Sequence, residues 1–314
     1  MTRQTMGAVH KAILLCSILL ILPHAHAVQI EPSDWNGSYT VQGGHSILLE
    51  EYTTTWCPRC AEIDPDLGIV AEEHGTRIAM VSYHPSDGVD AFGPEAAQHR
   101  IERLKIQHTA LGATPSFIVH NGEVREDVVE WPDVQGDILR AESNQRQYTN
   151  LTVTAQTNET HLTVTVMPPH ASEFDNRTQY TVLFVQHKKM VDEAFENPGE
   201  KHRDRVLVGL AEFPMEGQHF AIGATVEAPF VASYPTQGMD EWSAIVVHEY
   251  IEEELVNRSV IESQPFGVVE IAMKASVVDE GAEVPILLPI MIFLGIGILG
   301  LVSVQTKEKV REEE

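Results

Sequence analysis

Two cysteines in the run Trp56-Cys57-Pro58-Arg59-Cys60 have a spacing that allows thiol chemistry. A Cys-x-x-Cys pair alone is compatible with redox exchange, metal binding or a structural disulfide. Here an apolar, strand-like run precedes the pair and a helix-like run follows it, so Cys57 is expected at a helix start. Free backbone N–H groups and the helix dipole favour a thiolate there, and Arg59 adds positive charge. Cys60 lies about one turn later, where it is placed to resolve a mixed disulfide.

The elements around the pair alternate between strand and helix. Residues 47–53 predict a strand, 57–73 repeat apolar residues at helical spacing, and 78–83 predict a buried strand. This order predicts a right-handed parallel crossover. The pattern continues with a helix, a strand, an Asn-Gly hairpin turn, a second strand and a closing helix, over residues 95–105, 116–120, 121–122, 123–129 and 134–148.

The composition changes after Gln147. Short runs rich in β-branched residues follow one another with turn residues between them, and no helical period is sustained. Residues 149–275 therefore predict an antiparallel β-sandwich. Residues 28–45 carry Gly, Ser and Asn and are interpreted as a lead-in.

The run from about Ser46 to Gln147 resembles the thioredoxin superfamily. The resemblance is carried by the Trp-Cys-Pro-x-Cys motif, the strand before it, and Thr114-Pro115 ahead of an apolar strand and an Asn-Gly turn. It is most similar to extracytoplasmic members, which often carry proline after the first cysteine. The expected fold class is therefore an α/β thioredoxin-like domain over residues 46–148, followed by an all-β sandwich domain and one C-terminal transmembrane helix.

The same resemblance implies roles for individual residues. Pro115 is expected to be cis and to lie against the cysteine pair, and Thr114 to offer backbone hydrogen bonds to a substrate strand. Trp56 is expected to shield the pair at the substrate-binding surface, with ordinary packing as the alternative. Glu51 stands six residues before the first cysteine, where the family often has a buried acid that accepts the second cysteine's proton; the alternative is a solvated glutamate. The predicted catalytic residues are Cys57, Cys60 and Glu51.

Two further positions bear on this resemblance. Glu50 departs from the apolar residue usual at its place, which leaves open which residue of the strand faces inward. Residues 82–94 look like a lengthened crossover in one variant of the fold, and His84 is interpreted as a substrate-groove residue or an ordinary loop histidine.

The N-terminal end carries an export pattern. Basic residues precede an apolar run at 12–22, and Ala25-His26-Ala27 follows as a small-x-small cleavage site. Residues 1–27 therefore predict a secretory signal peptide, with an uncleaved anchor as the alternative. Cys16 lies inside this segment and would be lost on cleavage.

The C-terminal end predicts a membrane span. Residues 284–304 are apolar throughout, after a short acidic linker at 276–283. Basic residues follow at once, so the positive-inside rule places the tail, 305–314, in the cytoplasm. We therefore expect a single-pass cell-membrane protein that contacts the lipid bilayer through residues 284–304, with its N-terminal domains extracytoplasmic.

Charge and motif content narrow the partners. The formal net charge of -25 makes nucleic acid and anionic membrane surfaces poor partners. The chain has no Gly-rich phosphate loop, and His248 begins only half of a zinc-protease motif, so neither cofactor nor metal is expected. Five asparagines start Asn-x-Ser/Thr triplets and are candidate glycosylation sites. They are Asn36, Asn150, Asn158, Asn176 and Asn257.

The leading hypothesis is thiol–disulfide exchange outside the cytoplasm, by a membrane-tethered oxidoreductase. Its partners would be protein thiols or disulfides and a membrane or extracytoplasmic redox partner. One alternative is a surface-binding or adhesion protein in which Cys57 and Cys60 form an inert disulfide. Another is a metal-delivery protein that uses the two cysteines as soft ligands for Cu(I). The sequence leaves open the direction of electron flow.

Overall fold

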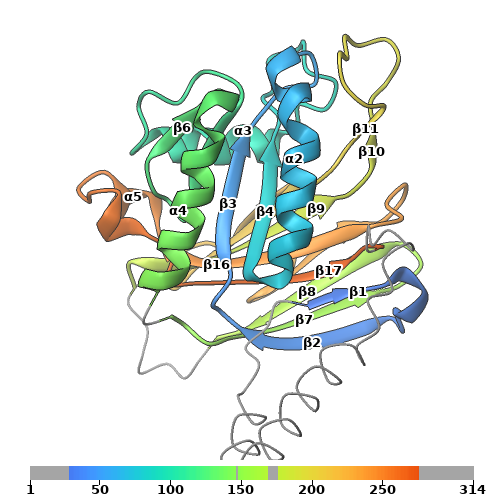
Figure 1. Ribbon diagram of the computed structural model, residues 1–314. Helices are drawn as coiled ribbons and strands as arrows, with labels where there is room; N and C mark the ends of the chain where they lie inside the picture. The colour runs from blue at the N-terminus through green and yellow to red at the C-terminus, as the bar shows by residue number, and fades with distance from the viewer. Residues whose placement is uncertain (1–27, 146–147, 169–175, 276–314) are drawn as a thin grey trace, which may run out of the picture. The chain divides into compact units, whose positions relative to one another are not determined.

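Strands dominate the computed structural model, which describes residues 28–145, 148–168 and 176–275 (Figure 1). The helices are α2 (Pro58–His74), α3 (Glu95–Lys105), α4 (Trp131–Asn144) and α5 (Glu252–Leu255). The strands of the first half are β1 (Val28–Ile30), β2 (Ser38–Gly43), β3 (Ile47–Tyr52), β4 (Ile78–Tyr83), β5 (Ser116–Val119) and β6 (Val124–Glu126). Those of the second half are β7 (Leu151–Thr157), β8 (His161–Met167), β9 (Thr178–Gln186), β10 (Lys189–Met190), β11 (His202–Arg203), β12 (Val206–Pro214), β13 (Phe220–Ile222), β14 (Thr225–Ala228), β15 (Val231–Pro235), β16 (Trp242–Tyr250) and β17 (Gly267–Met273).

A ten-stranded mixed sheet crosses both halves, in the order β1-β17-β16-β9-β12-β4-β3-β5-β6, with β13 paired to β12. β3 and β4 pair in parallel over their full length, as the crossover prediction requires. On its other side, β4 meets β12 in parallel at Ser82 and Val206. There the Ser82 N–H donates to the Arg205 carbonyl over 2.8 Å, so the first half continues directly into the second.

The predicted fold class is therefore wrong. An α/β thioredoxin-like domain followed by a separate all-β sandwich would need a sheet for each, but β3 to β6 share one sheet with β9, β12, β16 and β17. The described residues up to 275 also form a single compact unit. Within the described ranges, no helix combines the length and apolar character needed to cross a bilayer. The predicted signal peptide, linker, span and tail, at 1–27, 276–283, 284–304 and 305–314, lie outside those ranges.

A five-stranded sheet, β14-β15-β8-β7-β2, packs on the second half of the large sheet. Alternation along β7 and β8 buries Val153 and Val164, which join Val182 and Phe184 of β9 in one apolar cluster. The antiparallel packing predicted for 149–275 is thus present in part. Strands from before residue 149 take part as well, because β2 pairs with β7 and β1 with β17. Residues 28–45 supply strands to both sheets rather than a loose lead-in.

Helices cover both faces of β3 and β4. Ile47 and Leu49 of β3 pack with the apolar residues of α2 and α4, such as Leu67 and Ile138. Leu48 points to the opposite face, in a cluster that contains residues of α3 and of β9, β12 and β16. Figure 1 shows α2 and α4 on the near face and α3 behind. The strands and helices predicted between residues 47 and 105 are confirmed, and each of their ends lies within one residue of the predicted limit.

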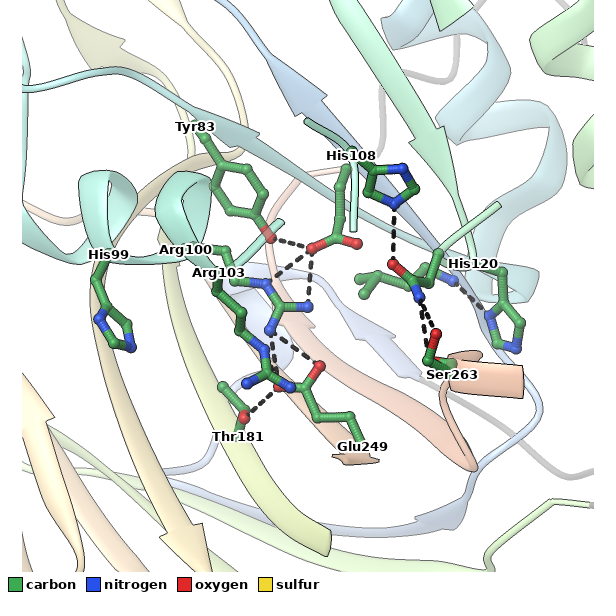
Figure 2. Close-up of polar contacts among 12 residues, drawn as sticks. Tyr83, His99, Arg100, Arg103, His108, His120, Thr181, Glu249 and Ser263 are labelled. Carbon is green, nitrogen blue, oxygen red and sulfur yellow. Dashed lines mark hydrogen bonds and ion pairs between the residues drawn. The ribbon is translucent and has the colours of Figure 1, made fainter. Parts of the chain in front are cut away.

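A buried ion network fastens α3 to strands from both halves (Figure 2). Arg100 pairs with Glu50 of β3 at 2.8 Å and with Glu249 of β16 at 2.7 Å. The Tyr83 hydroxyl donates to Glu50 over 2.8 Å, and the Thr181 hydroxyl donates to Glu249 over 2.6 Å. Burial raises the pKa of Glu249, but the adjacent arginine charges outweigh it and lower the pKa to about 2. Glu50 therefore faces α3, and its partners explain a charge where an apolar residue is usual.

Candidate functional site

A disulfide joins Cys57 and Cys60 at the start of α2, with 5.3 Å between their Cα atoms. Cys57 is the N-cap residue in an extended conformation, and Pro58 begins the helix, where its missing N–H leaves no bond unmade. The Cys60 N–H donates to the Cys57 sulfur over 3.1 Å. The helix start thus directs a backbone donor at the first cysteine, as the sequence predicted.

The Thr114–Pro115 loop reaches the same sulfur. The peptide bond between these residues is cis, and the Thr114 carbonyl oxygen lies 3.4 Å from the Cys57 sulfur. Thr114 is half-buried and Pro115 is buried. Thr114 and Cys57 are thus brought together from positions 57 residues apart, while the substrate-binding role of the loop stays a prediction.

Trp56 and Arg59 flank the cysteines differently from each other. Trp56 is half-buried beside Cys57. The Arg59 guanidinium pairs with Asp127 at 2.8 Å and with Glu62 at 2.5 Å. These two carboxylates balance its positive charge. The stabilisation of a Cys57 thiolate that was expected from Arg59 is therefore offset.

A loop after β4 holds the backbone just before the pair. Asp90 accepts from the Thr55 N–H over 2.7 Å and lies 2.9 Å from Nδ1 of His84. Its other oxygen accepts from the Phe92 N–H over 2.8 Å, and the Ala91 N–H donates to the Thr55 hydroxyl over 3.1 Å. Sequence reasoning missed Asp90; the only signal was its place in an Asp- and Gly-bearing loop after a buried strand.

Glu51 is buried at 2% exposure on the α2 side of β3. The Ser82 hydroxyl donates to its Oε2 over 2.6 Å. Burial is the main cause that raises the pKa of Glu51 to about 8, and the nearby Asp64 carboxyl adds to it, whereas Ser82 and Arg205 act in the opposite direction. The alternative of a solvated strand-end glutamate is therefore wrong, while the catalytic role of Glu51 stays a prediction.

A cavity of about 140 Å³ lies between α2, β3, β4 and the segment that includes β11. Its walls carry Glu51, His84 and Asp64. Arg203 of β11 pairs with Asp64 at 3.3 Å and donates to the Thr55 carbonyl over 3.4 Å. A segment from the second half of the chain thus closes one side of the cavity next to the cysteines, which no local sequence pattern indicated.

The remaining candidates are placed on the surface. All five sequon asparagines, at 36, 150, 158, 176 and 257, are exposed. Among the residues that the structure describes, no group of three or more His, Cys, Asp or Glu side chains is arranged to hold a metal ion.

Comparisons with known proteins do not identify a family for this chain. No family model matches the chain, and no curated protein matches it. One similar solved structure is HBP35 of Porphyromonas gingivalis, at 11% identity and a TM-score of 0.47, covering 77% of this chain and 81% of that one. Another is a structural-genomics target from Agrobacterium tumefaciens, at 13% identity and a TM-score of 0.42, covering 76% of this chain and 97% of that one. Likenesses this distant do not identify a family.

Proposed function

We propose that this chain performs thiol–disulfide exchange on protein substrates through Cys57 and Cys60. The observation that carries the proposal is the disulfide at the first turn of α2, with the Thr114 carbonyl oxygen against Cys57. The site's similarity to the thioredoxin superfamily, in its cysteine motif and its Thr114–Pro115 loop, is part of the same proposal.

The geometry supports a two-step exchange. In the reduced protein, the N–H of Cys60 that now points at the Cys57 sulfur would donate to a thiolate there. That thiolate attacks one sulfur of a substrate disulfide, and the other substrate sulfur leaves as a thiolate. Cys60 then attacks the Cys57 sulfur, the substrate leaves reduced, and the Cys57–Cys60 bond forms again. The reverse sequence oxidises a substrate dithiol.

The proposed setting is the outer side of the cell membrane, with residues 284–304 as the tether. The export and span patterns at the two ends of the sequence support it. The exposed sequon asparagines fit the same setting. The redox partner that reloads Cys57 and Cys60 would then itself be in the membrane or outside the cytoplasm.

Single cysteine variants test the function directly. Reduced Cys60→Ser, mixed with a peptide that contains a disulfide, should accumulate a covalent protein–peptide complex, because nothing resolves the mixed disulfide. Cys57→Ser should form none, because Cys60 is the more buried sulfur, at 1% exposure against 4%. Non-reducing electrophoresis and mass spectrometry read the result. Equal capture by both variants, or by neither, would contradict the assignment.

One observation favours a second candidate, a binding protein with an inert disulfide. Both sulfurs are buried in the oxidised protein, which limits in-line attack on either. A Cys57–Cys60 pair that resists reduction by excess glutathione in the folded protein would favour this second reading.

A further inference from the structure

The cavity under α2 contains two buried polar atoms with no hydrogen-bond partner among the described residues. They are Oε1 of Glu51 and Nε2 of His84, whose side chains are 2% and 1% exposed. Leaving such an atom without any hydrogen bond is unfavourable. Both residues line the same polar cavity of about 140 Å³, which is large enough to hold water beside their side chains.

The surrounding contacts decide which of these atoms donates. The two Asp90 oxygens accept from backbone N–H groups of Thr55 and Phe92, as a carboxylate does, so Nδ1 of His84 must be the donor toward Asp90. When the ring is neutral, Nε2 of His84 is then an acceptor. Oε2 of Glu51 accepts from Ser82, which leaves Oε1 to carry the proton of the neutral acid. The side chains that line the cavity can therefore supply one donor and one acceptor.

Cys60 lies on a face of α2 that also carries residues of the cavity wall. Cys60, Asp64 and Leu67 are spaced four and three residues apart on α2, so they share one face of the helix. Asp64 and Leu67 line the cavity, and so does Ala61, the residue after Cys60. The second cysteine is thus placed on the side of α2 where Glu51 lies.

We propose that Glu51, cavity water and the His84–Asp90 pair form a relay that removes the proton of Cys60 during resolution of a mixed disulfide. This inference rests on the proposed exchange function. A neutral Glu51 cannot accept a proton unless it gives one away, and the pKa of about 8 makes Glu51 neutral at physiological pH. Nε2 of His84 supplies the missing acceptor, and the Asp90 carboxylate stabilises the imidazolium that forms.

The step balances in atoms and electrons. Glu51 passes its proton through water to His84 and takes the proton of the Cys60 thiol. The Cys60 thiolate attacks the Cys57 sulfur of the mixed disulfide, the Cys57–substrate S–S bond breaks, and the substrate leaves as a thiolate. The products are the Cys57–Cys60 disulfide, a reduced substrate sulfur and one proton on His84, which returns to solvent. His84 acts through Glu51 and water and does not touch the reacting sulfurs.

Other charges face the cavity and enter the pH dependence. α2 contributes Asp64, whose pKa is raised mainly by burial. The opposite wall contributes charges of both signs, and arginines face the acids there. That wall carries Glu200, His202, Arg203, Asp204 and Arg205. None of these groups presents a buried, unpartnered nitrogen acceptor to the cavity as His84 does.

The test isolates the resolving step in the full-length protein. Reduced protein reacts with 5,5′-dithiobis(2-nitrobenzoate); the first coloured thiolate marks attack by Cys57, and the second marks resolution by Cys60. For His84→Gln, which keeps a polar side chain but cannot take up a proton at neutral pH, the second release should slow about 10- to 100-fold. The loss should shrink as the pH rises, because hydroxide then removes the Cys60 proton. The first release should be unchanged.

A matched variant and the wild-type outcome keep the two proposals apart. His120→Gln alters another buried histidine, one that lies at the end of β5 and does not line the cavity, and its pH profile should match the wild type. If the wild-type protein released no second coloured thiolate, the proposed exchange function itself would be contradicted. Wild-type resolution with the same pH profile in His84→Gln would overturn only the relay.

A measurement on the unaltered protein covers the case in which His84→Gln does not fold. Nitrogen-15 NMR of histidine-labelled protein distinguishes the two neutral tautomers. The relay requires a proton on Nδ1 and none on Nε2 of His84 near neutral pH. A resonance that shows Nε2 protonated in the neutral ring would contradict it.

Discussion

At the scale of single residues, the placement of the two cysteines follows from local rules. The N-cap position of Cys57, the proline after it and the spacing to Cys60 all follow from one short stretch, and the structure places them as that stretch predicted. The burial of Glu51 was implied by the resemblance to the thioredoxin superfamily, with a solvated glutamate as the alternative. The His84–Asp90 pair was not, because the partner of a loop histidine depends on how residues 84 to 93 fold back over Thr55.

The raised pKa of Glu51 gives a stability prediction for Glu51→Gln. In the unfolded chain the carboxyl titrates near 4.5, and in the folded protein near 8. Between these values the folded state holds a proton that the unfolded state has lost, so the wild-type free energy of unfolding falls as pH rises. The slope is at most about 1.4 kcal/mol per pH unit. Glu51→Gln removes this titration and should show a flatter profile by denaturant unfolding between about pH 5 and pH 8.

Glu62→Gln is the matched control, because Glu62 lies on the same helix α2 with a side chain that is 59% exposed. Its unfolding free energy should keep the wild-type pH profile. If the unfolding free energy of Glu51→Gln followed the same pH profile as the wild type, Glu51 would be ionised at neutral pH. The proposed relay would then not be needed.

At the scale of elements, the ion network explains why α3 belongs to both halves. Arg100 on α3 reaches β3 through Glu50 and β16 through Glu249, although 149 positions separate Arg100 from Glu249. The limits of α3 were predicted from composition, and they are correct. Its partners were not, because hydrophobic periodicity says which face is buried and nothing about which distant charge will meet it.

Arg100→Met should therefore destabilise the protein strongly. Removing the cation leaves the buried Glu50 carboxylate without its arginine partner and Glu249 with Arg103 alone, which costs about 3–5 kcal/mol in the free energy of unfolding. Chemical denaturation at neutral pH measures the effect.

Arg140→Met provides the comparison on α4. Arg140 pairs with Asp137, but its side chain is 63% exposed, so the loss should be below about 1 kcal/mol. If both substitutions cost the same, the network around Arg100 does not hold the two halves together as described.

At the scale of the whole unit, the chain builds one shared sheet where the sequence indicated two domains. The prediction failed because each half has its own convincing pattern, and the pairing that joins them is the short parallel contact of β4 with β12. Its residues, Ser82 and Val206, are far apart in the sequence and carry no mutual signal. The change in composition near residue 148 marks a change in element type and leaves the sheet unbroken.

A fragment of residues 46–148 should therefore fail to fold cooperatively by itself. The face of the sheet that carries Leu48 and Tyr83 packs in one cluster with Leu183 of β9, Leu207 of β12 and Ile245 of β16. Without those strands this apolar face is exposed and Arg100 loses Glu249. Calorimetry should show no cooperative transition for the fragment and one for residues 28–275. A fragment that melts cooperatively at a similar temperature would restore the two-domain interpretation.

The central claim is that the Cys57–Cys60 bond is made and broken in function, and its reduction potential in the full-length protein tests this most directly. Equilibration with glutathione buffers, followed by thiol trapping, gives the value. The account predicts a potential between about −270 and −120 mV, the span of known thiol–disulfide oxidoreductases. A potential below about −300 mV, where the glutathione pool does not reduce the bond, would contradict the account and leave the disulfide a structural one.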